Sequence, residues 1–282
     1  MRNVIHEREQ GGEPKRVVVS GSFDDIRSGD VRFLQEAARI GPVHLRLWSD
    51  ALVASTQGKP PVFLEAERRF VTGALRYVAG VSLFQSRSSI LRPVAGVRPD
   101  VVVVRPNEDD PGQRAACARL GVEYFVPDAS SLSGFPPCEL SDPDASARRV
   151  VVTGCFDWLH SGHLEFFHEA AAFGDLYVVV GSDRNLRYLK GDGHPLHGQD
   201  ERHYMVQAAK DVHRALISTG SGWMDAEPEI ASIAPHFYVV NEDGDQPVKR
   251  DFCRAHGLEY VVLRRRPHRG LPKRTSTSFR GF

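Results

Sequence analysis

Short apolar runs of strand length alternate along the chain with longer segments whose apolar residues recur at helical spacing. Val17–Val19, Val150–Thr153 and Leu176–Val180 are runs of the first kind, and the segment that begins at Leu164 is typical of the second. Strands that alternate with amphipathic helices are joined by crossovers and build parallel sheets. The pattern therefore predicts an α/β protein.

The second half of the chain continues this pattern to its end. After the strand that leads into Gly181-Ser182-Asp183, we expect a polar loop and then a helix around Glu201–Asp211. The further elements that we expect are the strands Ala215–Ser218 and Phe237–Val240, the helix Val248–His256 and the strand Glu259–Leu263.

The chain also repeats itself. Residues 17–50 align with residues 150–183 without a gap at an offset of 133, and fifteen of the 34 aligned positions are identical. Residues 114–126 align with residues 250–262 at an offset of 136. Two long ungapped registers indicate a duplicated domain. We place the two copies at 16–140 and 148–282, because the loop between them is rich in Ser, Pro and Asp.

Composition narrows the class of protein. The 282 residues suit two domains, and 41% hydrophobic residues allow each a core. Lys plus Arg and Asp plus Glu both number 36, which disfavours general binding to nucleic acid or anionic membranes. Residues 1–15 lack the apolar core of a signal peptide, and the apolar runs are too short to span a membrane. We expect a cytoplasmic protein without zinc or disulfides, since no two cysteines form a C-x-x-C pair.

The loop after the first strand of the second half carries the candidate chemistry. It runs from Thr153 to His163 and contains two histidines, His160 and His163, with Gly162 between them at a predicted helix start. In an open α/β sheet, ligands bind beyond the carboxyl ends of the strands. A helix N-terminus offers N–H groups to phosphate, and imidazoles donate hydrogen bonds to phosphoryl oxygens.

This loop resembles the GxFDxxHxGH signature of the cytidylyltransferase family of nucleotidyltransferases, and the resemblance extends over both halves. The matching residues are Gly154, Phe156, Asp157, His160, Gly162 and His163. Two further family elements have counterparts here. Lys190-Gly191, His194-Pro195 and Glu201-Arg202 stand for Lys-Gly, Arg-Pro and Glu-x-Arg, while residues 274–278 stand for R-T-x-G-I-S-T-T without the x-Gly insertion. The chain stops at Phe282, so we expect only a stump of the helix that usually comes next in the family. Seven basic residues and no acids lie between Leu263 and Phe282.

The resemblance implies two tandem Rossmann-like nucleotidyltransferase domains and the transfer of CMP from CTP to a small phosphorylated or phosphonate acceptor, with release of pyrophosphate. It implies catalytic roles for His160 and His163 at the α-phosphate and for Lys190 and Arg274 at the triphosphate. Magnesium would bridge the phosphates, with no dedicated protein ligand set. The residues implied in nucleotide binding are Thr153, Gly154, Cys155, Phe156, Asp157, Gly162, Asp183, Arg202, Ser276 and Thr277.

The repeat provides an internal control for these assignments. At equivalent positions of the first half, His160 is replaced by Arg27, His163 by Asp30, Lys190 by Gln57 and Arg274 by Cys138. The shared glycines and the Phe-Asp pair remain, whereas an aspartate that faces phosphate would repel it. We therefore expect the first half to be catalytically inactive. Because family members are commonly dimers of this domain, we expect the halves to pack as a pseudo-dimer, and a homodimer of the chain is a further option.

Several alternatives stay open at the level of sequence. The nucleotide could be ATP, as in adenylyltransferases that act on sugar phosphates, and the tandem arrangement favours CTP. The acceptor could be an aminoalcohol phosphate, a polyol phosphate, a phosphonate or a sugar phosphate. A nucleotide-binding regulator without activity is the non-enzymatic alternative. Class I aminoacyl-tRNA synthetases share the His-x-Gly-His core, but the zero net charge and the absence of an added tRNA-binding domain disfavour them.

Overall fold

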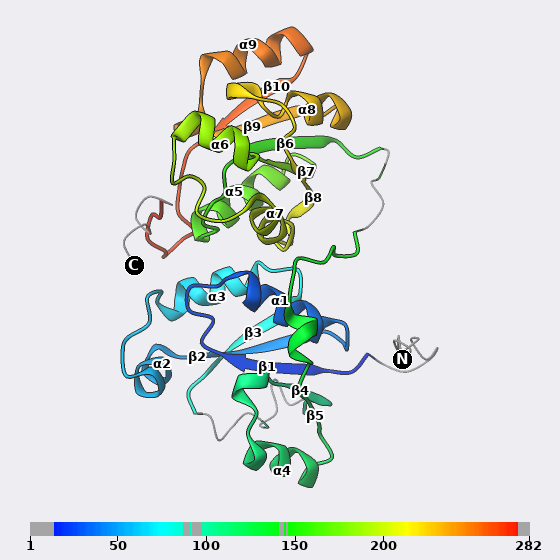
Figure 1. Ribbon diagram of the computed structural model, residues 1–282, viewed down its shortest axis with the longest axis vertical. Coiled ribbons are helices and arrows are strands. Elements are labelled where there is room, and N and C mark those ends of the chain that lie inside the picture. Colours follow the sequence, from blue (N-terminus) through cyan, green and yellow to red (C-terminus); the bar gives the residue numbers. More distant parts are fainter. Residues whose placement is uncertain (1–13, 87–90, 92–97, 141–143, 145, 276–282) are drawn as a thin grey trace.

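The computed structural model describes residues 14–86, 91, 98–140, 144 and 146–275. Within these ranges the strands form two five-stranded parallel sheets with the orders β3-β2-β1-β4-β5 and β10-β9-β6-β7-β8. Figure 1 shows one sheet in each half of the molecule. The predicted α/β class with two Rossmann-like parallel sheets is therefore confirmed.

The two halves share most of their elements in the same chain order, and among the described residues only η3 of the first half and η4 and α8 of the second lack a counterpart. The first comprises β1 (Val17–Gly21), α1 (Ser28–Ala38), β2 (Val43–Trp48), α2 (Asp50–Gln57), α3 (Glu65–Gly73), β3 (Val78–Phe84), β4 (Val101–Val103), η2 (Pro106–Glu108), α4 (Pro111–Arg119), β5 (Glu123–Phe125) and η3 (Ala129–Leu132). The second comprises β6 (Arg149–Gly154), α5 (Ser161–Ala171), β7 (Asp175–Val180), α6 (Asp183–Lys190), α7 (Gln199–Gln207), β8 (Val212–Ile217), η4 (Gly222–Met224), α8 (Glu227–Ile233), β9 (Phe237–Asn241), η5 (Glu242–Gly244), α9 (Pro247–His256) and β10 (Glu259–Leu263).

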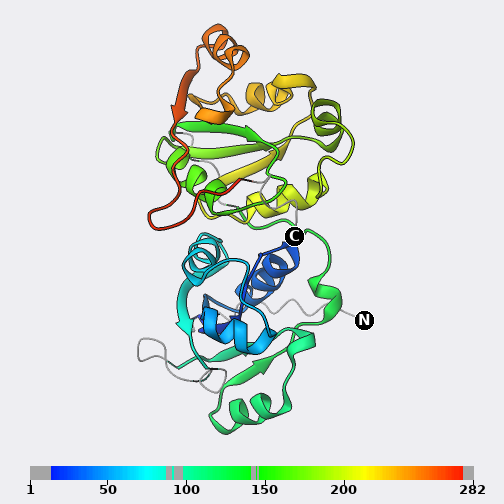
Figure 2. The ribbon, with the colours of Figure 1, turned by 90° about the vertical axis from the view of Figure 1, so that its left-hand side faces the viewer.

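Side chains alternate between the two faces of each sheet, and both faces are buried. In β1, Val17 and Val19 enter the core cluster that faces the other half, whereas Val18 enters the cluster beneath α4. The corresponding outer cluster of the second half includes Val151 and lies beneath α8 and α9. The helices α1, α3, α5 and α7 lie between the two sheets, as Figures 1 and 2 show. The inner cluster is continuous from one half to the other.

A pair of reciprocal backbone hydrogen bonds joins the halves. The N–H of Arg76 donates to the carbonyl of Ala208, and the N–H of Lys210 donates to that of Ala74, each at 2.9 Å. Between them, Leu75 and Ala209 form an isolated antiparallel β-bridge. Each residue of one hydrogen bond has its equivalent, 134 positions away in the chain, in the other bond, with the two halves exchanged. The two halves are therefore related by a pseudo-twofold arrangement.

This contact explains where the sequence expectation for a helix over Glu201–Asp211 differs from the structure. The helix α7 ends at Gln207, since the next residues turn to pair with the other half and then enter β8 at Val212. A second difference is α6, where we expected a polar loop. Its N-cap is Ser182, and its buried residues are limited to Asn185 and Leu186, which leaves little hydrophobic pattern to detect. Among the described helices, none has the length and apolarity that a bilayer crossing requires.

Candidate functional site

The loop between β6 and α5 is shaped by a glycine and an unusual phenylalanine. Phe156 has a φ of +50°, in the left-handed region that L-residues rarely adopt. Its ring lies over Gly154, where an added Cβ would come within 2.8 Å of the ring. The same ring meets His163 edge-on, with the ring centroids 5.2 Å apart. This turn therefore places the aromatic ring of Phe156 beside His163, the second histidine of the motif.

The two histidines of the motif lie together at the start of α5. Their rings are stacked, with centroids 3.9 Å apart and an interplanar angle of 18°. His160 is the N-cap residue, and its Nδ1 accepts a hydrogen bond from the N–H of Gly162 at 3.1 Å. Because Nδ1 is an acceptor, the proton of the neutral His160 ring resides on Nε2. The motif thus presents one defined imidazole tautomer beside the helix N-terminus.

Burial keeps both rings neutral. Burial and, to a smaller extent, the charge of Arg265 lower the pKa of His163 to about 3, while a hydrogen bond with the Trp158 backbone acts in the opposite direction. The pKa of His160 is also lowered strongly, first by burial and then by the charges of His163, Arg265 and Arg274. Near neutral pH the site therefore offers two uncharged imidazoles close to the guanidinium groups of Arg265 and Arg274.

The basic segment after β10 lies against this motif. The carbonyl of Arg274 would be 3.6 Å from a Cβ added to Gly162, so the segment passes close to the start of α5. Arg265 donates through Nη2 to that carbonyl at 3.0 Å. The guanidinium of Arg274 pairs with Glu67 of the first half, with Nη2 2.7 Å from Oε2. The structure thus brings Arg274 to the histidines.

Lys190 approaches the same loop from the end of α6. Burial raises the pKa of the Cys155 thiol, and the charge of Lys190 is the largest influence that lowers it. In the first half, the equivalent Gln57 donates through Nε2 to Ser22, the counterpart of Cys155, at 3.4 Å. The last residue of α6 therefore lies near the motif loop, where a lysine can reach a phosphate.

Three residues expected to bind nucleotide have scaffold contacts that recur in the first half. Asp157 accepts from the N–H groups of Leu196 and His197, as Asp24 does from Val62 and Phe63. Arg202 is 1% exposed and donates to the carbonyls of His197, Cys155 and Gly181 and to the Asp183 carboxylate.

Its counterpart Arg68 is 2% exposed and binds the carbonyls of Phe63 and Ser22 and the carboxylate of Asp50. Because the half without the histidines makes the equivalent bonds apart from that to Gly181, we assign Asp157, Asp183 and Arg202 to holding the loops.

The hydroxyl of Thr153, another residue expected to bind nucleotide, points across the sheet from α5. It is 2.8 Å from the hydroxyl of Tyr238, which belongs to the outer core cluster beneath α8 and α9. Ser276 and Thr277 lie outside the described residues. No group of three or more His, Cys, Asp or Glu suited to a metal ion occurs within the described ranges.

The corresponding positions of the first half are locked by ion pairs. Arg27 binds the Asp25 carboxylate and lies over the ring of Trp158, with 3.5 Å from its Cζ to the ring centroid. Asp30 pairs with Arg105 at 2.6 Å and accepts from the N–H of Arg27. In the first half, ion pairs therefore neutralise the two charged side chains, Arg27 and Asp30, that replace the imidazoles of the second half.

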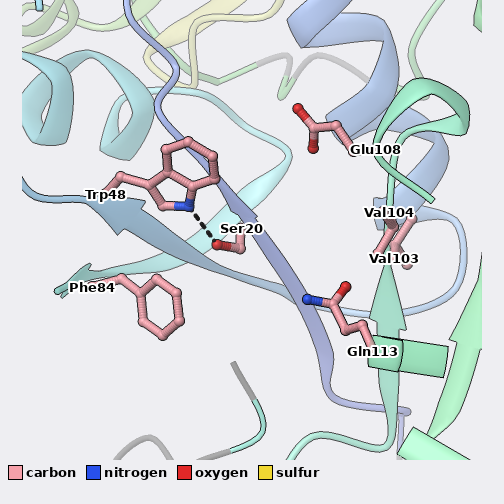
Figure 3. Close-up of a pocket in the computed structure, with 7 residues that line it drawn as sticks. All are labelled: Ser20, Trp48, Phe84, Val103, Val104, Glu108 and Gln113. Atoms are coloured by element: carbon pink, nitrogen blue, oxygen red, sulfur yellow. Dashed lines mark hydrogen bonds between the residues drawn. The ribbon is translucent and has the colours of Figure 1, made fainter. Parts of the chain in front are cut away.

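At the carboxyl ends of its strands, the first sheet also carries larger side chains than the second sheet. Trp48 and Phe84 stand at the positions of Gly181 and Ser218, and the indole N–H of Trp48 donates to Ser20 at 2.8 Å (Figure 3). They line a pocket of about 370 Å³ together with Val103, Val104, Glu108 and Gln113. Aromatic rings and a carboxylate here do not provide a cradle for phosphate.

Sequence reasoning missed Glu67 and Ser161, whereas Arg265 was expected only as one of the seven basic residues after Leu263. Glu67 was hidden because it belongs to the other half of the chain. A signal for it exists, since Glu67-Arg68 aligns with Glu201-Arg202 at an offset of 134, between the two longer registers. That alignment would have indicated that the two glutamates lie at equivalent places.

Comparisons with known proteins point to one family for the second half of the chain. The family model described as cytidylyltransferase-like matches residues 151–280. The FAD synthase of Methanosphaerula palustris is 35% identical over 120 residues, which are 42% of this chain and 74% of that protein. The FAD synthase of Aciduliprofundum boonei is 34% identical over 119 residues, 41% of this chain and 76% of that protein.

The bifunctional protein HldE of Methylococcus capsulatus is 39% identical over 100 residues, which are 35% of this chain. The match spans only 20% of the length of that HldE. The similarity to HldE is therefore confined to one part of a longer protein.

Proposed function

Since this chain belongs to the cytidylyltransferase-like family of nucleotidyltransferases, we propose that its second half transfers a nucleoside monophosphate to a small phosphorylated acceptor and releases pyrophosphate. The observation that carries the proposal is the pair of stacked, neutral histidines at the start of α5, with Arg274 and Lys190 brought to the same loop. In the first half, none of these four positions has the same residue type.

The reaction needs positioning and charge neutralisation more than a protein nucleophile. An oxygen of the acceptor phosphate attacks the α-phosphorus in line, and the bond to the bridging oxygen breaks as pyrophosphate leaves with its electron pair. The acceptor oxygen is an anion near neutral pH. We assign the Nε2–H of His160 and the ring of His163 to the α-phosphate and the leaving oxygen, where hydrogen-bond donors stabilise developing charge. Lys190 and Arg274 bind the triphosphate.

As the nucleotide donor we favour ATP, with CTP as the alternative. A protein named FAD synthase forms a product that carries an adenylyl group, and the chain spans about three quarters of two such proteins. The tandem arrangement is the feature that favours CTP. Candidate acceptors are sugar phosphates, polyol and aminoalcohol phosphates and phosphonates, since each presents an anionic oxygen for the attack.

Magnesium fits this scheme as an ion carried by the triphosphate. Mg²⁺ prefers oxygen ligands and is commonly held by substrate phosphates with few protein groups. The basic side chains around the histidines suit a phosphate chain better than a bare cation. When bound, the ion neutralises charge on the phosphates.

Pyrophosphate release tests this function. Purified protein with magnesium is supplied with ATP or CTP, each crossed with a panel of phosphorylated alcohols, phosphonates and sugar phosphates. We expect one nucleotide to give acceptor-dependent pyrophosphate. His163→Ala should lower turnover by about 10²–10³, because a donor to the transition state is lost.

His168→Ala is the matched control on the same helix, since this side chain is 70% exposed and bonds to Asp211. A His163→Ala variant as active as this control would overturn the assignment of the histidines. Tight nucleotide binding without turnover for every pair would instead favour a regulator.

A further inference from the structure

A buried carboxylate of the first half reaches the candidate site of the second. Glu67 lies on α3 and is 2% exposed. Its Oε1 accepts from the Ser161 hydroxyl at 2.6 Å, and its two oxygens accept from Nε and Nη2 of Arg274 at 2.7–3.1 Å. Glu67, Ser161 and His160 line one pocket of about 310 Å³ between the halves. The carboxylate thus ties the start of α5 to the basic segment.

Neighbouring residues of α3 dock the same segment. The ring of Phe63, which precedes α3, lies 5.2 Å from the guanidinium carbon of Arg274. Phe70 stacks on His268, with ring centroids 4.3 Å apart. Glu67 and Phe70 are three residues apart on α3 and therefore lie on one side of the helix, and Phe63 stands just before its N-cap, Leu64. This side of the first half faces the basic segment of the second.

Comparison of the two halves shows which contacts of Glu67 are common to both halves and which one is specific to the site with the two histidines. On α7, the equivalent Glu201 accepts from the Ser28 hydroxyl at 2.6 Å, so the serine–glutamate bond occurs twice. The second partner of Glu201 is His197, with 3.3 Å from its Nδ1. The residue aligned with Arg274 is Cys138. Of these two equivalent glutamates, Glu67 beside the two histidines pairs with an arginine, whereas the second described partner of Glu201 is a histidine.

We propose that the first half serves the reaction as a built-in positioning partner, with Glu67 orienting Arg274 toward the triphosphate. A bidentate carboxylate fixes the plane of a guanidinium, which a single contact would leave free to rotate. The pair with Glu67 uses Nε and Nη2 of the Arg274 guanidinium, so Nη1 lies on the opposite side of the guanidinium from the carboxylate. Glu67 is a positioning residue, since it acts through Arg274. The inference rests on the proposed function.

A double-mutant cycle tests this role in the full-length chain. The variants are Glu67→Gln, Arg274→Ala and the double variant, with Glu201→Gln as the matched control. Glutamine keeps the size of Glu67 and an acceptor for Ser161 but removes the charge. We expect Glu67→Gln to lower kcat/KM for the nucleotide by about 10- to 100-fold, the usual cost of misplacing a reacting group. Glu201→Gln should change it by no more than about twofold.

The decisive result is non-additivity. In the Arg274→Ala background, Glu67→Gln should cause no further loss, because the group that it orients is gone. A loss of the same size in both backgrounds, or a loss matched by Glu201→Gln, would overturn the proposal. Arg274→Lys, which keeps the charge and loses the fork, should show the same loss as Glu67→Gln and serves if the glutamine variant does not fold.

Calorimetric titration with inorganic tripolyphosphate gives a second readout that does not depend on turnover. If the wild-type protein turns over no substrate pair, the proposed function fails, and the cycle is read from tripolyphosphate affinity alone. An affinity that Glu67→Gln lowers only when Arg274 is present supports the positioning role. An affinity that the substitution leaves unchanged or increases contradicts it.

Discussion

At the scale of single residues, one backbone scaffold supports two opposite local chemistries. Phe23 and Phe156 both have a positive φ, and each ring lies over a glycine at the end of its strand. The residues at the start of the next helix differ between the halves. His160 is a buried neutral ring, whereas Arg27 at the same place pairs with an aspartate. The loop shape is therefore set by the glycine and phenylalanine, and the chemistry by the residues of the helix start.

The lowered pKa values predict a specific loss of stability in acid. The folded-state pKa of His163, about 3, lies below its ordinary value of 6.5, so the stabilisation is present above pH 6.5 and is lost as the pH falls toward 3. From pH 6.5 to 5 this amounts to about 2 kcal/mol for one such histidine. Urea unfolding at pH 7.5 and 5.0 should show a smaller decrease for His163→Gln than for the wild type.

His168→Gln is the control for this measurement, since it removes an exposed histidine from the same helix. Its decrease in unfolding free energy between the two pH values should equal that of the wild type. An equal decrease in His163→Gln would show that His163 is protonated in the folded protein.

At the scale of elements, α1 and α5 begin in the same way, but only α5 has close neighbours at its glycine. A Cβ added to Gly162 would lie 3.0–3.1 Å from the ring of His160, whereas one added to Gly29 would meet nothing within 4 Å. The difference arises because the His160 ring folds back over the first turn to accept from Gly162. The glycine of α5 is thus tied to the position of the catalytic candidate.

A matched pair of alanine substitutions tests this difference. Gly162→Ala must displace the His160 ring by a few tenths of an ångström, and we expect turnover to fall by up to about 10-fold, since a full 1 Å misplacement costs about 10²-fold. Gly29→Ala should leave turnover unchanged and raise the free energy of unfolding by about 0.4–1 kcal/mol, because glycine costs more entropy on folding. Steady-state pyrophosphate release and urea unfolding measure both effects. Equal turnover of the two variants would contradict the assignment.

At the scale of the whole molecule, the two halves share one continuous inner core. Leu75 of the first half and Ala209 of the second are 0% and 1% exposed and pair across the interface. Buried polar contacts add to this packing, as where the Tyr204 hydroxyl donates to Gln35 at 2.7 Å. Such an interface resembles a divided domain core more than a contact between independent domains. The halves are therefore expected to unfold together.

Calorimetry of an interface variant tests this cooperativity. The wild type should unfold in one transition, whereas Leu75→Asp buries an unpaired charge at the interface and should separate the transitions of the two halves. Turnover should fall as well, since Glu67 would no longer be held against Arg274. Leu120→Asp is the control, because Leu120 is 48% exposed. A single unshifted transition in Leu75→Asp would show that the halves are coupled in another way.

The sequence by itself determined the α/β class, the duplication and the grouping of the two histidines, because these depend on local patterns and on the geometry of one loop. It placed Lys190 and Arg274 only through resemblance, and it did not separate ligand contacts from scaffold. That distinction required burial and partners, as Arg202 shows with its guanidinium enclosed by protein oxygens.

The tertiary structure alone decided that Glu67 meets Arg274, since 207 positions separate them in the chain and a carboxylate finds its partner in space. The end of α7 was decided in the same way, by backbone hydrogen bonds to the other half.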